Sequence, residues 1–453
     1  MFPYIPRGEG EEATMLDAIG VGSFEDLLAP LPQAFRVSGL LALPGPQSEH
    51  EIAHDLARMA GRNKCHPDTL AFLGAGCYDH MVPAAIDHVA YRSEFYTAYT
   101  PYQAEVGQGT LTAIFEFQTV MAELTGMDLA NASLYDGASA LAEAAWLGLG
   151  ATGRNKILVA GPLHPNYRHV LATYTQGLDV EILVDPAPAG VTDAAWVERH
   201  LDDTVGVVVG SSPNFLGGVE DFTALFAEAK KRGAVTVSVF QPHALMLYKT
   251  PGAMGADLAV GEGRSLGTPP SFGGPALGLF AVTGAYVRSI PGRLIGETVD
   301  RQGKRCYVMT LRTREQDIRR AKATSNICTN QSLLALRATL YASLLGPRGM
   351  REVAERCVEN AHYAADRLSA AGGFRLAFEA PFFQEFALEC PRPAREVVAA
   401  AESRGVLAGV DLGRFRPEWE RLLLVCCNEK HRRRDLDTLV DVLSAGAGEV
   451  ARV

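Results

Sequence analysis

Residues 257–275, DLAVGEGRSLGTPPSFGGP, run from an apolar, strand-like segment into a loop rich in glycine and proline. This arrangement is typical of an enzyme that holds a cofactor at the end of a strand, where a lysine would be expected as the nucleophile. The segment contains no lysine, and position 264 is an arginine. Arg264 cannot serve as that nucleophile, because a guanidinium stays protonated at any working pH and offers no lone pair to an aldehyde. The segment therefore resembles an active site without its reactive group.

A second candidate is Asp136-Gly-Ala-Ser, which begins an alanine-rich helix. Free backbone N–H groups at such a helix start would bind a phosphate. Asp136 could instead cap the helix, and its carboxylate would repel a phosphate, so we favour the cap. The glycines of GLGATG, residues 148–153, match a dinucleotide-binding pattern, but they end this helix and precede the strand at Lys156. We interpret them as a helix C-cap and turn.

Four tyrosines lie within twelve positions ahead of an amphipathic helix: Tyr91, Tyr96, Tyr99 and Tyr102. Tyrosines in loops can be ordinary packing residues. This density, interleaved with threonine hydroxyls, suits the wall of a site or a protein interface.

A metal site is not expected. Cys65, His66, Cys77 and His80 could be drawn as zinc ligands, but their spacing matches no familiar zinc site. The eight cysteines are scattered and include no CxxC pair, which indicates reduced, mostly packed thiols.

Composition places the chain among soluble globular proteins. The net charge of −10 argues against a general nucleic-acid-binding function. The longest apolar stretch, near residues 276–287, is shorter than the roughly 20 residues that span a bilayer. The N-terminal sequence MFPYIPRGEGEE matches neither a secretory signal nor a transit peptide, so we expect a cytoplasmic protein. Residues 301–322 form a basic segment, for which a solvated helix face is the ordinary explanation.

The elements that position these residues follow a simple order. A helical and loop-like arm, residues 1–70, precedes a large α/β domain, residues 71–330, and a small α+β domain, residues 331–453. Near-continuous apolar strands alternate with helices in the large domain, as a parallel sheet covered on both faces requires. We expect these strands at residues 156–161, 180–185, 205–210, 235–240, 257–262 and 277–282.

Several segments resemble the P-protein of the glycine cleavage system, and more narrowly the α subunit of its two-chain bacterial form. They are FLGAGCYDHMVPAAIDH (72–88), the tyrosine-rich segment, GEGRSLGTPPSFGGPALGLFA (261–281), TLRTREQDIRRAKATSNICTNQSLLA (310–335) and APFFQEFALE (380–389).

The resemblance implies the fold of aspartate-aminotransferase-type pyridoxal-phosphate enzymes, fold type I. In that fold a lysine forms the Schiff base and an aspartate pairs with the pyridine nitrogen. Arg264 falls at the lysine position and Gln241 at the aspartate position. We therefore expect no covalently bound pyridoxal phosphate and no catalytic residue in this chain.

The family also implies an α₂β₂ assembly in which a β subunit binds pyridoxal phosphate and decarboxylates glycine. The aminomethyl group would pass to the lipoyl arm of H-protein. This chain would line the partner's site through Tyr96, Tyr99 and Tyr102 and through residues 323–329, which supply the donors Thr324, Ser325, Asn326 and Thr329. A capped helix start is the alternative for residues 323–329.

Two other functions stay open at this point. One is a self-sufficient homodimeric pyridoxal-phosphate enzyme that uses Lys249, although this lysine precedes the strand it should follow. The other is a purely structural pseudoenzyme.

Overall fold

The computed structural model describes residues 8, 10–37, 39, 41–64 and 69–448. The chain forms two compact units, residues 1–64 and 65–453. Among the described residues, no helix combines the length and the apolar character that crossing a membrane requires. The domain boundaries expected at residues 70 and 330 stay predictions.

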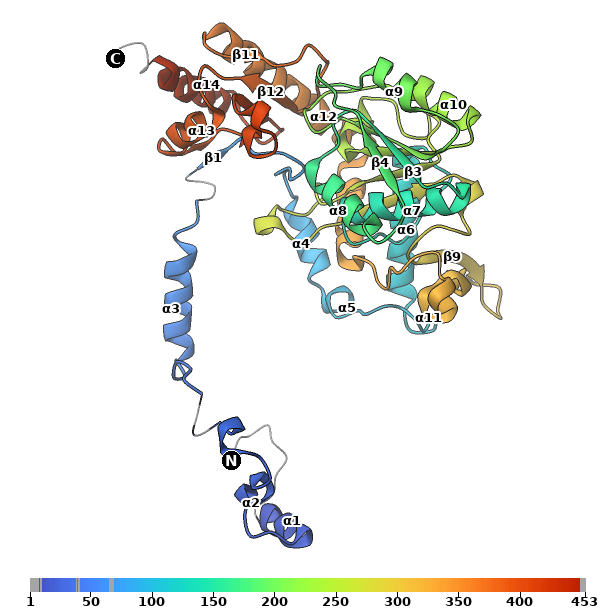
Figure 1. The fold of residues 1–453 in the computed structure, drawn as a ribbon, viewed down its shortest axis with the longest axis vertical. Helices are drawn as coiled ribbons and strands as arrows, with labels where there is room; N and C mark the ends of the chain where they lie inside the picture. The colour runs from blue at the N-terminus through green and yellow to red at the C-terminus, as the bar shows by residue number, and fades with distance from the viewer. Residues whose placement is uncertain (1–7, 9, 38, 40, 65–68, 449–453) are drawn as a thin grey trace. The chain divides into compact units, whose positions relative to one another are not determined.

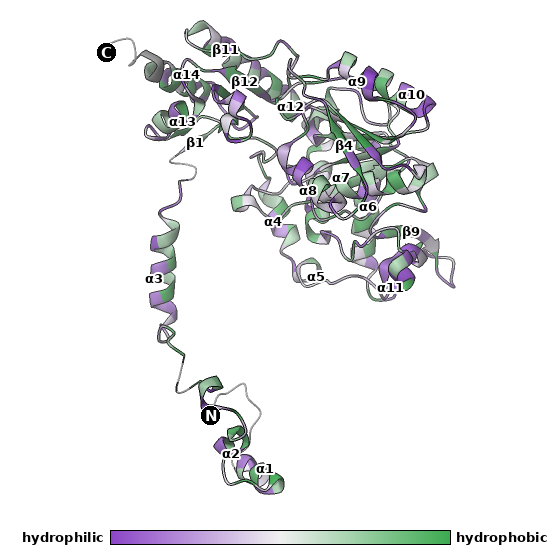
Figure 2. Ribbon diagram, viewed as in Figure 1, coloured by the Kyte–Doolittle hydropathy of each residue, from purple (hydrophilic) through white to green (hydrophobic). Residues whose placement is uncertain are grey.

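The first unit contains three α-helices and no buried residue among those described: α1 (Glu11–Ile19), α2 (Phe24–Leu28) and α3 (Glu49–Ala60). A capping box begins α3, because Ser48 accepts from the backbone N–H of Glu51 and the Glu51 side chain accepts from that of Ser48. Figure 2 shows hydrophilic and hydrophobic residues alternating along this helix. Its exposed apolar residues recur at helical spacing: Ile52, Leu56 and Met59.

A seven-stranded sheet forms the centre of the second unit, in the order β2-β8-β7-β6-β5-β3-β4. The strands are β2 (Leu129–Ala130), β3 (Lys156–Ala160), β4 (Glu181–Val184), β5 (Val205–Ser212), β6 (Val235–Phe240), β7 (Leu258–Glu262) and β8 (Gly278–Val282). All six expected strands are present and the sheet is mostly parallel, as expected, although β8 runs antiparallel to β7. The connection between them, residues 263–277, holds one short 3₁₀ turn and no crossover helix, which a parallel neighbour would need.

Helices cover both faces of this sheet, as Figure 1 shows. On one face, Ile157 and Val159 of β3 pack with the alanine-rich α7 (Gly137–Thr152). On the other face, Leu158 and Ala160 pack with α9 (Ala194–His200) and α10 (Thr223–Lys231). Successive residues of a strand point to opposite faces of the sheet. Because helices cover both faces, nearly every residue of these strands must be apolar. The helices α6 (Gln108–Thr125) and α8 (Pro165–Thr175) complete the layers.

The C-terminal part follows the long helix α12 (Ser332–Ala370), which kinks at Gly346, where φ is 62°. A four-stranded sheet in the order β11-β12-β15-β14 packs with α13 (Ala394–Glu402) and α14 (Arg433–Gly448). Its strands are β11 (Arg375–Leu376), β12 (Glu385–Glu389), β14 (Val410–Asp411) and β15 (Leu422–Cys426). In the apolar segment FRLAFEA, residues 374–380, only Arg375 and Leu376 form a strand, β11.

Shorter elements complete the second unit. The strand β1 (Leu70–Ala71) pairs in parallel with β13 (Val406–Leu407). The helices α4 (Ala84–Ala90) and α5 (Ser93–Tyr96) precede α6. The hairpin β9 (Leu294–Val299) and β10 (Arg305–Thr310) leads to the short helix α11 (Gln316–Arg319). The basic segment 301–322 thus comprises the strand β10, 3₁₀ turns and the four-residue helix α11, and the single solvated helix face expected there is wrong.

Candidate functional site

A cavity of about 630 Å³ lies at the carboxyl ends of β5, β6 and β7. Gln241 directly follows β6, and Arg264 lies two residues after β7. These strands are parallel neighbours, so their carboxyl ends meet at one edge of the sheet. The structure therefore brings Arg264, Gln241 and Asp136 to one cavity, whose lining residues include no lysine among those that the structure describes.

Arg264 is held in the cavity wall. Its Nη1 lies 3.3 Å from Cys77 Sγ, and its backbone N–H donates to Glu262 Oε1 at 3.0 Å. Its Nε is buried without a hydrogen-bond partner. A guanidinium in this place can orient polar groups but cannot form an imine.

The start of α7 is filled by the chain's own carboxylates. Asp136 accepts from the backbone N–H of Ser139 at 2.8 Å, and Glu262 Oε2 accepts from that of Gly137 at 3.1 Å. Burial raises the pKa of Glu262, while its backbone hydrogen bonds act in the opposite direction. The predicted cap is confirmed, and Gly153 ends the same helix in the left-handed conformation. Two acidic side chains occupy the place where a phosphate would bind.

Gln241 is a structural cap. Its Oε1 accepts from the backbone N–H of Ala244 at 2.7 Å, which begins the short 3₁₀ helix Pro242–Met246. A neutral amide cannot keep a pyridine nitrogen protonated as a carboxylate does. With Arg264 after β7 where a lysine would be needed, and with carboxylates at the helix start, the residues of this cavity do not fit a Schiff-base-bound pyridoxal phosphate.

Sequence reasoning missed the acidic side chain opposite these groups. Glu385 of β12 accepts hydrogen bonds from Tyr78 Oη and from the backbone N–H of Ala75, both at 2.6 Å. Burial raises the pKa of Glu385 to about 7 against the lowering effect of these two bonds. No short sequence motif identifies Glu385, because the residues that donate hydrogen bonds to it lie about 300 positions earlier in the chain.

A family model for the glycine cleavage system P-protein matches residues 3–443. The chain belongs to this family. The probable glycine dehydrogenase (decarboxylating) subunit 1 of Prosthecochloris aestuarii is 47% identical over 444 residues, which cover 98% of this chain and 99% of the relative. That of Thermomicrobium roseum is 49% identical over 442 residues, covering 97% and 98%.

Solved structures agree with this P-protein family membership. The crystal structure of a glycine decarboxylase (P-protein) of the glycine cleavage system, in inhibitor-bound form, shares 44% identity with a TM-score of 0.88, covering 98% of this chain and 100% of that chain. The cysteine desulfurase from Thermococcus onnurineus shares only 13% identity with a TM-score of 0.63, covering 90% and 100%, and shows the fold alone. The expected fold, that of fold type I pyridoxal-phosphate enzymes, is confirmed.

Lys249 does not line the cavity of this P-protein chain. Its Nζ lies 2.8 Å from Asp221 Oδ2 and 2.9 Å from Thr223 Oγ1, at the start of α10. Because Lys249 is bound in a half-exposed ion pair outside the cavity, the geometry gives no support to a self-sufficient enzyme that uses it.

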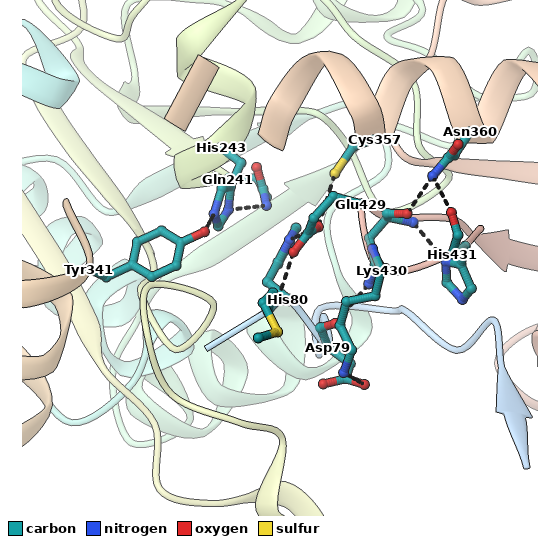
Figure 3. Close-up of polar contacts among 12 residues, drawn as sticks. Asp79, His80, Gln241, His243, Tyr341, Cys357, Asn360, Glu429, Lys430 and His431 are labelled. Atoms are coloured by element: carbon teal, nitrogen blue, oxygen red, sulfur yellow. Dashed lines mark hydrogen bonds and ion pairs between the residues drawn. The ribbon is translucent and has the colours of Figure 1, made fainter. Parts of the chain in front are cut away.

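A buried polar cluster connects Gln241 with the C-terminal part of the chain (Figure 3). His80 Nδ1 lies 2.8 Å from Glu429 Oε2, and the His80 ring stacks on that of His243. His243 Nε2 lies 3.1 Å from Tyr341 Oη. Burial raises the pKa of Glu429, but the contacts with His80 outweigh it and lower the pKa to about 2. This cluster is a buried polar clamp between distant segments of the chain.

Potential metal ligands among the described residues are His80, Cys357 and Glu429, whose ligand atoms lie within 4.8 Å of one another. Glu429 Oε1 is already occupied by the backbone N–H of Met81 at 2.7 Å. Of the four candidate zinc ligands considered from the sequence, Cys65 and His66 lie outside the described residues, while Cys77 contacts Arg264. All seven described cysteines are free thiols, as predicted.

Arg293 joins two of the predicted interface residues. Its Nη2 lies 3.3 Å from Tyr102 Oη, and its Nη1 donates to Thr329 Oγ1 at 3.2 Å. The same guanidinium donates to the backbone carbonyl of Cys328 at 2.7 Å. Arg293 is 4% exposed, so it fixes Tyr102 and residues 323–329 from within. Sequence reasoning did not identify this arginine, which lies outside the basic segment.

The remaining predicted interface residues lie at or near the surface. Tyr96 and Tyr99 are 60% and 80% exposed, and Thr324 and Asn326 are also exposed. Ser325 is half-buried, and its Oγ accepts from the backbone N–H of Ile327 at 3.1 Å. The alternative of a helix cap is wrong, because α12 begins only at Ser332, after Gln331.

Proposed function

We propose that this chain is the non-Schiff-base α subunit of a glycine decarboxylase. Together with a β subunit that binds pyridoxal phosphate, it would decarboxylate glycine and transfer the aminomethyl group to the lipoyl arm of H-protein. The bound cofactor supplies the electron sink for decarboxylation in the partner. The relatives are named subunit 1, and those enzymes therefore comprise more than one kind of chain.

One observation carries this proposal. The cavity at the carboxyl ends of β6 and β7 has Arg264 and Gln241 at the two cofactor-anchoring positions, and carboxylates at the start of α7. Three independent requirements of a Schiff-base site fail at the same place. One change could be accommodated, but all three together remove the nucleophile, the ring anchor and the phosphate cup.

The contribution of this chain would then lie at its surface. Thr324 and Asn326 present exposed donors on an extended segment that Arg293 holds through Thr329 and Cys328. A phosphate reached by such donors gains charge-assisted hydrogen bonds. The exposed Tyr96 and Tyr99 suit a protein interface, where aromatic rings bury large areas with few rotatable bonds.

Glycine–CO₂ exchange with purified H-protein tests the proposal. We expect neither this chain nor a β subunit alone to catalyse exchange, and the two together to do so. Exchange by this chain alone would show a self-sufficient enzyme. Full exchange by a β subunit alone, unchanged when this chain is added, would leave the chain a purely structural protein.

A further inference from the structure

A second cavity, of about 260 Å³, lies at the carboxyl ends of β3 and β4. Its floor is the loop after β3, residues 161–163, with Pro165 at the start of α8, and the end of β4 with the loop that follows it, residues 184–187. Its cover is the segment 414–419, between β14 and β15. Loops at the carboxyl ends of parallel strands are where open α/β sheets bind ligands. His169 and Phe215 line both this cavity and the larger one.

Three arginines face this cavity: Arg168 in the first turn of α8, Arg414 and Arg416. In the described part of the chain, none of their guanidinium groups has an ion pair or a hydrogen bond with a side chain. The aromatic cover orients two of them. Arg416 lies over the Trp419 ring at 4.5 Å, and Arg414 over the Phe415 ring at 5.7 Å.

The only carboxylate in the described lining does not neutralise them. Asp185 is 1% exposed and accepts from the backbone N–H groups of Gly161, Ala187 and Asp193, at 3.1, 2.8 and 2.8 Å. These three bonds engage its oxygens in holding the loops together. Burial lowers the pKa of Arg168, and the like charge of Arg416 lowers it further. Like charges held together beside a cavity are stabilised when an anion enters it.

We propose that this cavity binds phosphate, either free or as the monoester of a small molecule, through Arg168, Arg414 and Arg416. Three positive charges face one carboxylate, whose oxygens already accept hydrogen bonds. The positive charge that remains is balanced by a bound dianion but not by a ligand with a single carboxylate. Guanidinium groups form two parallel hydrogen bonds with phosphate oxygens. The start of α8, an eleven-residue helix with Pro165 in the lining, adds its positive end.

Calorimetric titration of the full-length chain at low ionic strength tests this site, with inorganic phosphate, glycerol 3-phosphate and glycerol as probes. We expect both phosphates to bind with one site per chain and glycerol not to bind. Tighter binding of glycerol 3-phosphate identifies a monoester as the ligand, and equal binding identifies free phosphate. Arg168→Gln with Arg416→Gln should weaken phosphate binding by roughly a hundredfold, about tenfold for each charged contact.

The matched control is Arg348→Gln with Arg395→Gln, which removes the same charge from exposed positions on α12 and α13. It should leave phosphate binding unchanged. As a second readout, phosphate should raise the unfolding temperature of the parent and the control but not of the cavity variant. Equal phosphate binding by the cavity variant and the control would overturn the proposal. So would binding of polyglutamate without phosphate binding, because the arginines would then be a docking surface for an acidic protein.

Discussion

At the scale of single residues, the proposed function depends on three features of the large cavity: Arg264, Gln241 and the carboxylates at the start of α7. Arg264 alone explains the loss of the nucleophile, but Gln241 and the Asp136–Glu262 pair explain why restoring a lysine is not enough. The Arg264→Lys variant should therefore bind no pyridoxal phosphate covalently. Its absorbance spectrum with added cofactor should lack the internal-aldimine band. The appearance of this band at full occupancy would show that the other two replacements are unimportant.

The buried contact of His80 with Glu429 gives a stability prediction at the same scale. The folded-state pKa of Glu429, about 2, is lower than its ordinary value of 4.5, so its contribution is present above pH 4.5 and is lost as the pH falls toward 2. Glu429→Gln should lower the free energy of unfolding by about 3 kcal/mol at pH 7. The difference should shrink in urea titrations between pH 4.5 and 3. Equal urea midpoints at pH 7 would contradict the buried clamp.

At the scale of elements, residues 323–329 are an extended segment fixed by Arg293, and not a helix start. If their donors reach the partner's cofactor, Thr324→Ala or Asn326→Ala should lower its affinity or the glycine–CO₂ exchange rate by roughly tenfold. Ser325→Ala should have a similar effect. Thr313→Ala, in the preceding 3₁₀ turn, is the control. Unchanged rates and affinities in all three variants, with normal assembly, would move the contribution of this chain to Tyr96, Tyr99 and Tyr102.

The helix α3 gives a second prediction for an element. Ile52, Leu56 and Met59 form an apolar face that no described residue of its unit covers. Leu56→Glu should leave the folding of the free chain unchanged and weaken its association with a β subunit, because a charge would enter an apolar contact. His54→Glu, on the opposite side of the helix, is the control. Sedimentation of the mixed subunits measures the difference, and equal assembly of both variants would exclude α3 from the interface.

The sequence predicted much of the cavity, for identifiable physical reasons. Arg264 and Gln241 each follow a strand, and parallel strands end at one edge, so their convergence could be foreseen. The direction of β8 could not be foreseen, because the apolar pattern of a buried strand is the same in both directions. Glu385 with Tyr78 and Glu429 with His80 are pairs separated by 307 and 349 positions. Such contacts exist only once the two parts of the chain have packed together.

At the scale of the whole molecule, the chain has the fold of pyridoxal-phosphate enzymes of fold type I, and in the proposed function it holds no Schiff-base cofactor of its own. Its exposed tyrosines and the apolar face of α3 are then surfaces for a partner. An obligate partner commonly covers more than about 2,000 Å². We expect the chain alone to self-associate and to form a discrete heterotetramer with a β subunit, as measured by light scattering after sizing. A chain that stays monomeric and does not bind the β subunit would contradict this assembly.

The proposed absence of a Schiff-base site is tested most directly by borohydride reduction of the purified chain with excess pyridoxal phosphate, followed by intact-mass measurement and peptide mapping. Reduction makes any imine permanent, so a Schiff-base lysine would carry one cofactor per chain at a single position. We predict no stoichiometric adduct at a unique site in this chain, and one such adduct in a β subunit treated in the same way. A stoichiometric adduct on one lysine of this chain, Lys249 above all, would contradict the account.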